Sequence, residues 1–219
     1  MKTTFLIMVG LMLPILSTAT SLVPPPPQIK ATSYILLDAE TNTVIAEYGA
    51  DETNPPASLT KIMTSYLVEQ MIQRGVVERN DKVPVSVKAW KAEGSKMFIR
   101  EGTEVYLMDL LRGVVIQSGN DASIALAEFV AGDENSFAQM MNEQASQLGM
   151  LNSNFVNSTG LPDEGHYSSA RDMALLTKDM IKRFPEHYAL YSERSFKFNN
   201  IEQPNRNRLL RYDLSLIHI

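Results

Sequence analysis

The sequence contains no cysteine and only three histidines, His166, His187 and His218. Without cysteine, the chain can form no disulfide, no thiolate nucleophile and no cysteine-ligated zinc site. Three scattered imidazoles give poor support to a catalytic triad built on histidine or to a three-histidine metal site. Thiol chemistry is therefore excluded, and histidine-centred chemistry is disfavoured.

Positive charge is also scarce, with 20 Lys and Arg against 25 Asp and Glu and a net charge of -5. The isoelectric point near 5.3 argues against a nucleic-acid-binding protein, which usually carries a basic stripe. Hydrophobic residues make up 44% of the sequence, which is ordinary for a globular protein and argues against intrinsic disorder. The 219 residues allow one large domain or two small ones.

Charge is almost missing from the first 28 residues, where Lys2 is the only charged side chain. An apolar run over residues 5–16 precedes small residues at 17–19, a pattern typical of a signal peptide. A buried core helix is the alternative, but it would carry polar residues at helical spacing. We therefore expect a signal peptide over residues 1–19 and export of the protein. Residues 20–30 then form a proline-rich, stiff spacer before a domain that starts near Ala31.

The rest of the chain predicts two strands, then a block of helices, then strand again. Segments rich in β-forming residues at 33–38 and 43–48 flank a turn, which predicts a hairpin. Alternation of Phe196 and Phe198 predicts a later strand. Apolar spacing predicts helices over residues 58–74, 105–117, 121–130, 135–148 and 169–183.

Three of these helix ends carry signals in the sequence. Gly149 is expected to end the fourth helix, because glycine readily adopts the left-handed conformation found there. Ser169 with Asp172 resembles a capping box that opens the fifth helix. Pro185 is expected to terminate that helix, because proline cannot continue it.

Ser58 and Lys61 stand three residues apart at the predicted start of the first helix. Side chains at this spacing share one helix face, so the lysine amine can reach the serine oxygen. Lysine can act as the base that activates serine if burial or nearby cations lower its pKa. The helix N-terminus favours a neutral lysine and stabilises negative charge at the serine oxygen. A capping serine beside a solvated lysine explains the same pair, and such spacing arises by chance about once in a chain this long.

A second polar pair, Ser118 and Asn120, lies between two apolar predicted helices. A loop clamped in this way is rigid and could offer Ser118 as a proton relay and Asn120 as a ligand for a substrate amide. Gly119 as a helix stop and Asn120 as a cap explain these residues without any chemistry. The two pairs together, in this order after a hairpin, are much more specific than either alone.

With these motifs the chain resembles the D-alanyl-D-alanine carboxypeptidases, specifically the penicillin-binding protein 5/6 group of low-molecular-mass penicillin-binding proteins. The resemblance runs from about Gln28 to Leu210 and rests on residues 33–36, 56–66, 117–122, 168–175 and 205–207. It implies an α/β (α+β) fold of the penicillin-binding transpeptidase and serine β-lactamase type. In that fold an antiparallel sheet is flanked by helices and accompanied by an all-helical subdomain.

The resemblance also implies a mechanism without metal or organic cofactor. Ser58 would attack the penultimate D-Ala of a peptidoglycan pentapeptide stem, and Lys61 would accept its proton. Ser118 would pass a proton to the leaving amine, while Asn120 would hold a substrate amide. β-Lactams would acylate the same serine, and the protein would work in the periplasm, at the periplasmic face of the inner membrane.

The sequence departs from this family at the Lys-Thr-Gly motif, which binds the substrate carboxylate from an edge strand. No Lys-Thr-Gly is present, and the last lysine is Lys197. We therefore expect a C-terminally truncated catalytic domain over residues 31–213, inactive by itself, without its final strands and its membrane-anchoring C-terminal helix. Residues 214–219 can be encoded by DNA that resembles a transposon-end sequencing adapter, so we expect an artefactual tail.

Two other functions stay open at this point. A class A β-lactamase would use a loop glutamate for deacylation, which Asp163 and Glu164 could suggest. Residues 161–165 do not match that loop, however, and Ser-Gly-Asn departs from the Ser-Asp-Asn of that class. The other alternative is a non-catalytic protein that only binds peptidoglycan. The four motif side chains, those of Ser58, Lys61, Ser118 and Asn120, are all intact, which argues against this alternative.

Overall fold

The computed structural model describes residues 29–211. The expected signal peptide, nearly all of the expected spacer, and the expected artefactual tail lie outside these residues. The chain divides into two compact units, Met1–Lys30 and Ala31–Ile219. Every helix and strand described below belongs to the second unit.

The predicted hairpin is present as β1 (Tyr34–Leu37) and β2 (Val44–Tyr48), which pair antiparallel. The Asp38 side chain shapes its turn by accepting a hydrogen bond of 2.7 Å from the backbone N–H of Thr41. The hairpin contacts α6 (Ala170–Arg183), so the second unit brings its first strands beside a helix more than 120 residues later in the chain.

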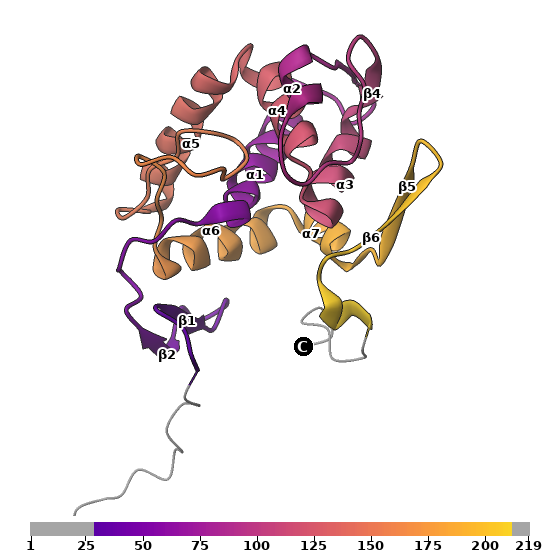
Figure 1. Ribbon diagram of the computed structural model, residues 1–219. Helices are drawn as coiled ribbons and strands as arrows, with labels where there is room; N and C mark the ends of the chain where they lie inside the picture. The colour runs from indigo at the N-terminus through magenta and orange to yellow at the C-terminus, as the bar shows by residue number, and fades with distance from the viewer. Residues whose placement is uncertain (1–28, 212–219) are drawn as a thin grey trace, which may run out of the picture. The chain divides into compact units, whose positions relative to one another are not determined.

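Five longer helices form the centre of the unit: α1 (Thr60–Gln73), α3 (Leu107–Gln117), α4 (Asn120–Ala131), α5 (Glu134–Leu148) and α6. Figure 1 shows α1 surrounded by the others, and it contacts each of them. The first eight residues of α4 are all buried, because small residues such as Ala122 and Ala125 let its neighbours approach closely. The predicted motifs therefore sit at the ends of buried helices.

The remaining elements are shorter. They comprise η1 (Ala57–Leu59), β3 (Lys82–Pro84), α2 (Val87–Lys91), β4 (Glu104–Tyr106), α7 (Pro185–Ala189), η2 (Leu190–Ser192), β5 (Ser195–Phe198), β6 (Ile201–Pro204) and η3 (Arg208–Arg211). Within the described residues the strands form three separate two-stranded antiparallel sheets. In the same part of the chain, no helix has both the length and the apolar character needed to cross a membrane.

Several predicted boundaries differ from the observed ones. The helix expected from Ser58 begins at Thr60, because a 3-10 turn precedes it. The helix expected from residue 105 begins two residues later, because β-branched Val105 pairs with Val83 in the β3–β4 ladder. The helix expected to stop before Pro185 does end at Arg183, and Pro185 then takes the first position of α7, where its missing N–H is not needed.

Two further predicted helix ends are confirmed. Gly149 follows α5 in the left-handed conformation with φ of 76°. The Ser169 side chain accepts from the Asp172 backbone N–H at 3.2 Å. The reciprocal half of the predicted capping box is not formed, because the Asp172 carboxylate accepts from Ser153 instead.

Candidate active site

Ser58 lies exposed in the 3-10 turn η1, directly after a residue with unusual backbone geometry. Ala57 has a φ of 46°, a region that side chains larger than glycine rarely adopt. About a hundred residues later in the chain, Gly160 approaches this residue so closely that a Cβ on Gly160 would stand only 1.8 Å from the Ala57 carbonyl oxygen. Strained backbone of this kind clusters at functional sites, where surrounding structure enforces it.

Lys61 lies one turn further along and is only 4% exposed. Its Nζ is 3.3 Å from Ser58 Oγ and donates to the Thr159 carbonyl at 2.6 Å. Burial, and then the positive charge of Arg206, lower the pKa of Lys61 from 10.5 to about 8. The predicted pair is thus brought together, with the amine tuned toward the form that can accept a proton.

The loop over residues 157–160 positions the carbonyl that holds Lys61. The Asn157 side-chain oxygen accepts from the backbone N–H groups of Thr159 and Gly160, at 3.1 and 2.7 Å. Thr64 Oγ1 donates to the neighbouring Ser158 carbonyl at 2.7 Å. The loop therefore runs along α1. The successive carbonyls of Ser158 and Thr159 accept hydrogen bonds from the side chains of Thr64 and Lys61, which lie one turn apart on that helix.

A buried carboxylate supports the same loop from behind. Glu134 Oε1 accepts from both the backbone N–H and the hydroxyl of Ser158, at 3.0 and 2.7 Å. Its other oxygen is paired with Lys88 Nζ at 2.8 Å. The first residue of α5 thus fixes the loop that in turn fixes Lys61.

Ser118 does not lie in an extended loop, because only two residues separate α3 from α4. It adopts the left-handed conformation with φ of 59°. Its Oγ is buried and has no hydrogen-bond partner among the described residues. A buried hydroxyl without a hydrogen-bond partner costs free energy, so such a group usually has a function. Because no other described residue occupies its donor and acceptor sites, Ser118 could both accept and donate a proton, as the predicted relay requires.

Asn120 is the first residue of α4, and Gly119 rather than Asn120 occupies the cap position. The Asn120 Nδ2 donates to the Glu93 carbonyl at 2.6 Å. A carbonyl only accepts, so this contact fixes the amide orientation and leaves the side-chain oxygen for a substrate N–H.

Asp121 is a residue of the site to which the sequence analysis assigned no role. It is fully buried, and its carboxylate accepts hydrogen bonds of 2.9 to 3.2 Å from the backbone N–H groups of Met97, Phe98, Ile99 and Ala122. Asp121 therefore ties the segment after Glu93 to the start of α4, next to Asn120. An acidic residue in the first turn of an otherwise apolar helix is the sequence signal that could have identified it.

His166 is a second residue without a predicted role. It is 4% exposed, and its Nδ1 accepts from the Val156 backbone N–H at 3.2 Å. Nε2 must then carry the proton that is donated to Thr60 Oγ1 at 2.7 Å. Burial lowers the pKa of His166 despite the opposing charge of Asp163. A neutral imidazole thus fastens the loop after residue 157 to the start of α1.

The two predicted pairs belong to neighbouring helices, since α1 packs against both α3 and α4. Arg206 adds a second link, because its backbone N–H donates to Ile116 at the end of α3 while its charge acts on Lys61. Across residues 29–211, no group of three or more His, Asp or Glu side chains is placed to hold a metal ion.

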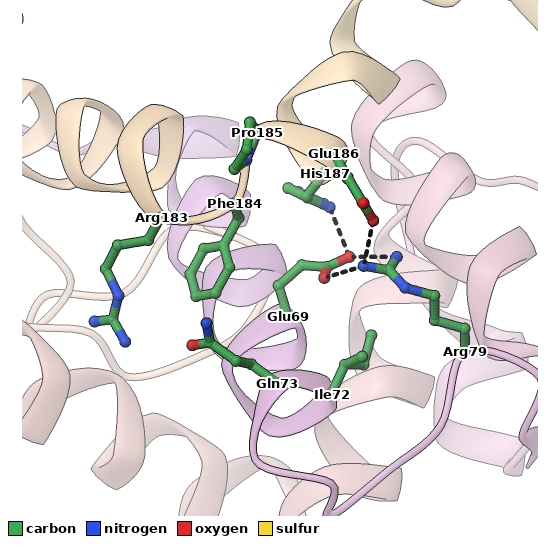
Figure 2. A pocket seen from close by; sticks show the side chains of 9 residues that line it. All are labelled: Glu69, Ile72, Gln73, Arg79, Arg183, Phe184, Pro185, Glu186 and His187. Atoms are coloured by element: carbon green, nitrogen blue, oxygen red, sulfur yellow. Dashed lines mark hydrogen bonds and ion pairs between the residues drawn. The ribbon is translucent and has the colours of Figure 1, made fainter.

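A separate cavity of about 270 Å³ lies against the C-terminal half of α1 and includes His187 in its lining. Figure 2 shows the buried Glu69 at its centre, where the carboxylate meets Arg79 at 3.1 Å and His187 Nδ1 at 3.2 Å. Arg79 also reaches Glu186 at 3.6 Å. This network joins α1 to α7 and the loop after α1, so we assign it a structural role.

Comparison with known proteins places the chain among carboxypeptidases. The sequence profile of a family described as D-alanyl-D-alanine carboxypeptidase matches residues 19–217. D-alanyl-D-alanine carboxypeptidase DacC of Escherichia coli is 48% identical over 190 residues, which are 84% of this chain and 48% of that protein. These names favour the carboxypeptidase resemblance over the class A β-lactamase alternative.

Solved structures agree with the expected fold class. Penicillin-binding protein 5 from Haemophilus influenzae is 43% identical with a TM-score of 0.84, covering 86% of this chain and 56% of the other. Penicillin-binding protein D2 from Listeria monocytogenes, solved in an ampicillin-bound form, is 25% identical with a TM-score of 0.77 and covers 86% and 77%. The chain spans about half the length of the curated relatives it matches.

Proposed function

Since the chain belongs to the D-alanyl-D-alanine carboxypeptidase family, we propose that the protein removes the terminal D-alanine from peptidoglycan pentapeptide stems through an acyl-enzyme on Ser58. The observation that carries this proposal is the arrangement of Ser58, Lys61 and the Thr159 carbonyl. A buried amine with a lowered pKa stands within reach of an exposed hydroxyl, which is the arrangement that serine activation needs.

Acylation follows from this geometry. In the neutral amine, one N–H of Lys61 donates to Thr159 while the lone pair faces Ser58 and takes its hydroxyl proton. The Ser58 oxygen then bonds to the carbonyl carbon of the penultimate D-Ala. The bond to the terminal D-Ala breaks as Ser118 gives its proton to the leaving amine, and Ser118 regains a proton from Lys61.

Deacylation and binding complete the proposed cycle. Water attacks the ester at Ser58, which releases a tetrapeptide stem and restores the hydroxyl. Asn120 holds the substrate backbone through its side-chain oxygen. A β-lactam presents a similar carbonyl and stays attached to Ser58 because its leaving group remains tethered. The Lys-Thr-Gly motif that the family uses for the substrate carboxylate is not in these 219 residues.

We also propose that the protein acts outside the cytoplasm, in the periplasm. The apolar run at residues 5–16 and the lack of cysteine support this location. Fractionation of cells that express the protein with and without residues 1–19 tests it. Retention of both forms in the cytoplasm would overturn the proposal.

The activity is tested on the protein expressed from its complete gene. Incubation with penicillin should add one penicillin mass to a peptide containing Ser58, and a pentapeptide stem should release D-alanine. Ser58→Ala should abolish both, whereas Ser146→Ala, an exposed serine on α5, should change neither. A penicillin adduct on Ser58→Ala would show that another residue is the nucleophile. Penicillin binding without D-alanine release would favour the non-catalytic alternative.

A further inference from the structure

His166 joins the two segments that hold Lys61. Its Nε2 lies 2.7 Å from the hydroxyl of Thr60, which directly precedes Lys61 on α1. Its Nδ1 lies 3.2 Å from the backbone N of Val156. Val156 stands three residues before Thr159, whose carbonyl accepts from Lys61. One side chain therefore helps to fix the loop that carries this carbonyl against the helix that carries the lysine.

Only the neutral imidazole makes both contacts. The Val156 N–H can only donate, so Nδ1 must present a lone pair and Nε2 must carry the single ring proton. A second proton would have to sit on Nδ1, where it would face the Val156 N–H across 3.2 Å. Two donors repel each other, and the partly buried N–H would lose its acceptor. Protonation of His166 is therefore incompatible with the observed contact.

The surroundings of the ring favour the neutral form. Thr60 from α1 and Phe155 and Val156 from the loop after α5 face it, and none of these carries a charge. Burial lowers the pKa of His166 from its ordinary value of 6.5, and the negative charge of Asp163 opposes this only in part. The ring is thus neutral near pH 7 and gains its proton in mild acid.

A proton can reach the ring from solvent. His166 is only 4% exposed, but it lines a surface cavity of about 430 Å³. The other charged residues of that lining are Asp163 and Glu164, both exposed and acidic. The nearby charge on α1 is Lys61, whose amine is directed to the Thr159 carbonyl instead. The ring can therefore titrate within the folded protein.

We propose that His166 is a positioning residue for the serine site and that its protonation switches this site off in acid. The inference rests on the proposed function, because the site that it controls is the one that becomes acylated. The neutral ring holds the loop against α1 and keeps the Thr159 carbonyl on Lys61. The protonated ring releases Val156, which loosens the loop and the hold on Lys61. His166 takes no proton from Ser58 and acts only through the position of Lys61.

The first test is the pH dependence of penicillin acylation, measured on the protein expressed from its complete gene. Protonation of Lys61 alone changes the rate about ten-fold per pH unit. Protonation of His166, with a midpoint below 6.5, should steepen the fall in acid toward about a hundred-fold per unit. In His166→Gln an amide can accept from Val156 and donate to Thr60, but it does not titrate. This variant should keep the ten-fold slope throughout.

Two further variants separate position from titration. His166→Ala removes both contacts, so it should lower the acylation rate at pH 8 by about ten-fold or more, and glutamine should restore part of this loss. His187→Gln, at another buried histidine, should keep the steep acid limb of the wild type. If His166→Gln, normalised to its own rate at pH 8, falls as steeply in acid as the wild type, the switch is overturned.

A second measurement does not depend on activity. NMR titration of the wild-type protein should give a midpoint for His166 below 6.5, and the Thr159 amide and the Lys61 side chain should shift with the same midpoint. Both shifts should be absent in His166→Gln. Resonances of Thr159 and Lys61 that do not follow the ring would overturn the inference, even with acylation intact. If penicillin never acylates the protein, the proposed function fails, and this titration decides the switch by itself.

Discussion

The lowered pKa of Lys61 gives the sharpest prediction, because both chemistry and stability depend on it. With a pKa of about 8, about a tenth of Lys61 is neutral at pH 7, which is roughly 300 times more than at its ordinary value of 10.5. We expect the penicillin acylation rate to rise about ten-fold per pH unit below pH 8 and to level off above it. Lys61→Arg keeps the charge but cannot supply a neutral base, so it should lose nearly as much rate as Lys61→Ala. Lys91→Arg, at an exposed lysine, is the matched control.

The titration of Lys61 should also change the free energy of unfolding, but in a different pH window. The folded pKa lies below the unfolded one, so below pH 8 both states bind the proton and burial of the ammonium lowers the free energy of unfolding. Between pH 8 and about 10.5 the unfolded chain binds a proton that the folded chain has lost, so stability rises with pH. The shift from 10.5 to about 8 corresponds to about 3 kcal/mol. Because Lys61→Met buries no charge, it should be more stable than the wild type at pH 7. This difference in the free energy of unfolding should shrink by about 3 kcal/mol between pH 8 and about 10.5.

Two measurements check this reasoning independently of activity. NMR titration of the Lys61 side chain should give a midpoint near 8. Urea unfolding of wild type and Lys61→Met at pH 7 and pH 10.5 should give the stability difference directly. A midpoint above 10, or a stability gap that does not change with pH, would refute the claim that burial tunes this lysine.

Three further variants follow from the contacts of the site. Arg206→Gln removes the cation that helps lower the Lys61 pKa, so the pH–rate profile for acylation should move to higher pH, and an unmoved profile would contradict this. Gly160→Ala should cost more than about 2 kcal/mol and most of the acylation rate, because its Cβ would stand 1.8 Å from a backbone oxygen at a φ of 79°. Asp121→Ala should cost about 3 kcal/mol in urea unfolding, because it leaves several backbone N–H groups without an acceptor, and a near-wild-type midpoint would contradict this.

The parts of the fold that the sequence predicted are those decided by local patterns. The hairpin, the five longer helices and the strand at Phe196 all appeared, because hydrophobic periodicity and helix-stop residues act over short distances. The β3–β4 pair was not predicted, because its strands are only three residues long and the second runs straight into α3. The pairing of Ser58 with Lys61 was predictable for the same local reason, since both lie on one helical turn.

The groups that hold Lys61 in place could not be found by local reasoning. Thr159 is 98 residues away in sequence and acts through its backbone carbonyl, which every residue type possesses, so its identity carries no signal. The informative residues are its neighbours: Asn157, whose side chain folds the loop, and Gly160, where only a glycine allows the close approach to Ala57. The chemistry of the lysine thus depends on the shape of a distant backbone. Substitutions of Asn157 or Gly160 should therefore affect Lys61 more than substitutions of Thr159, although of these three residues only Thr159 is hydrogen-bonded to the lysine.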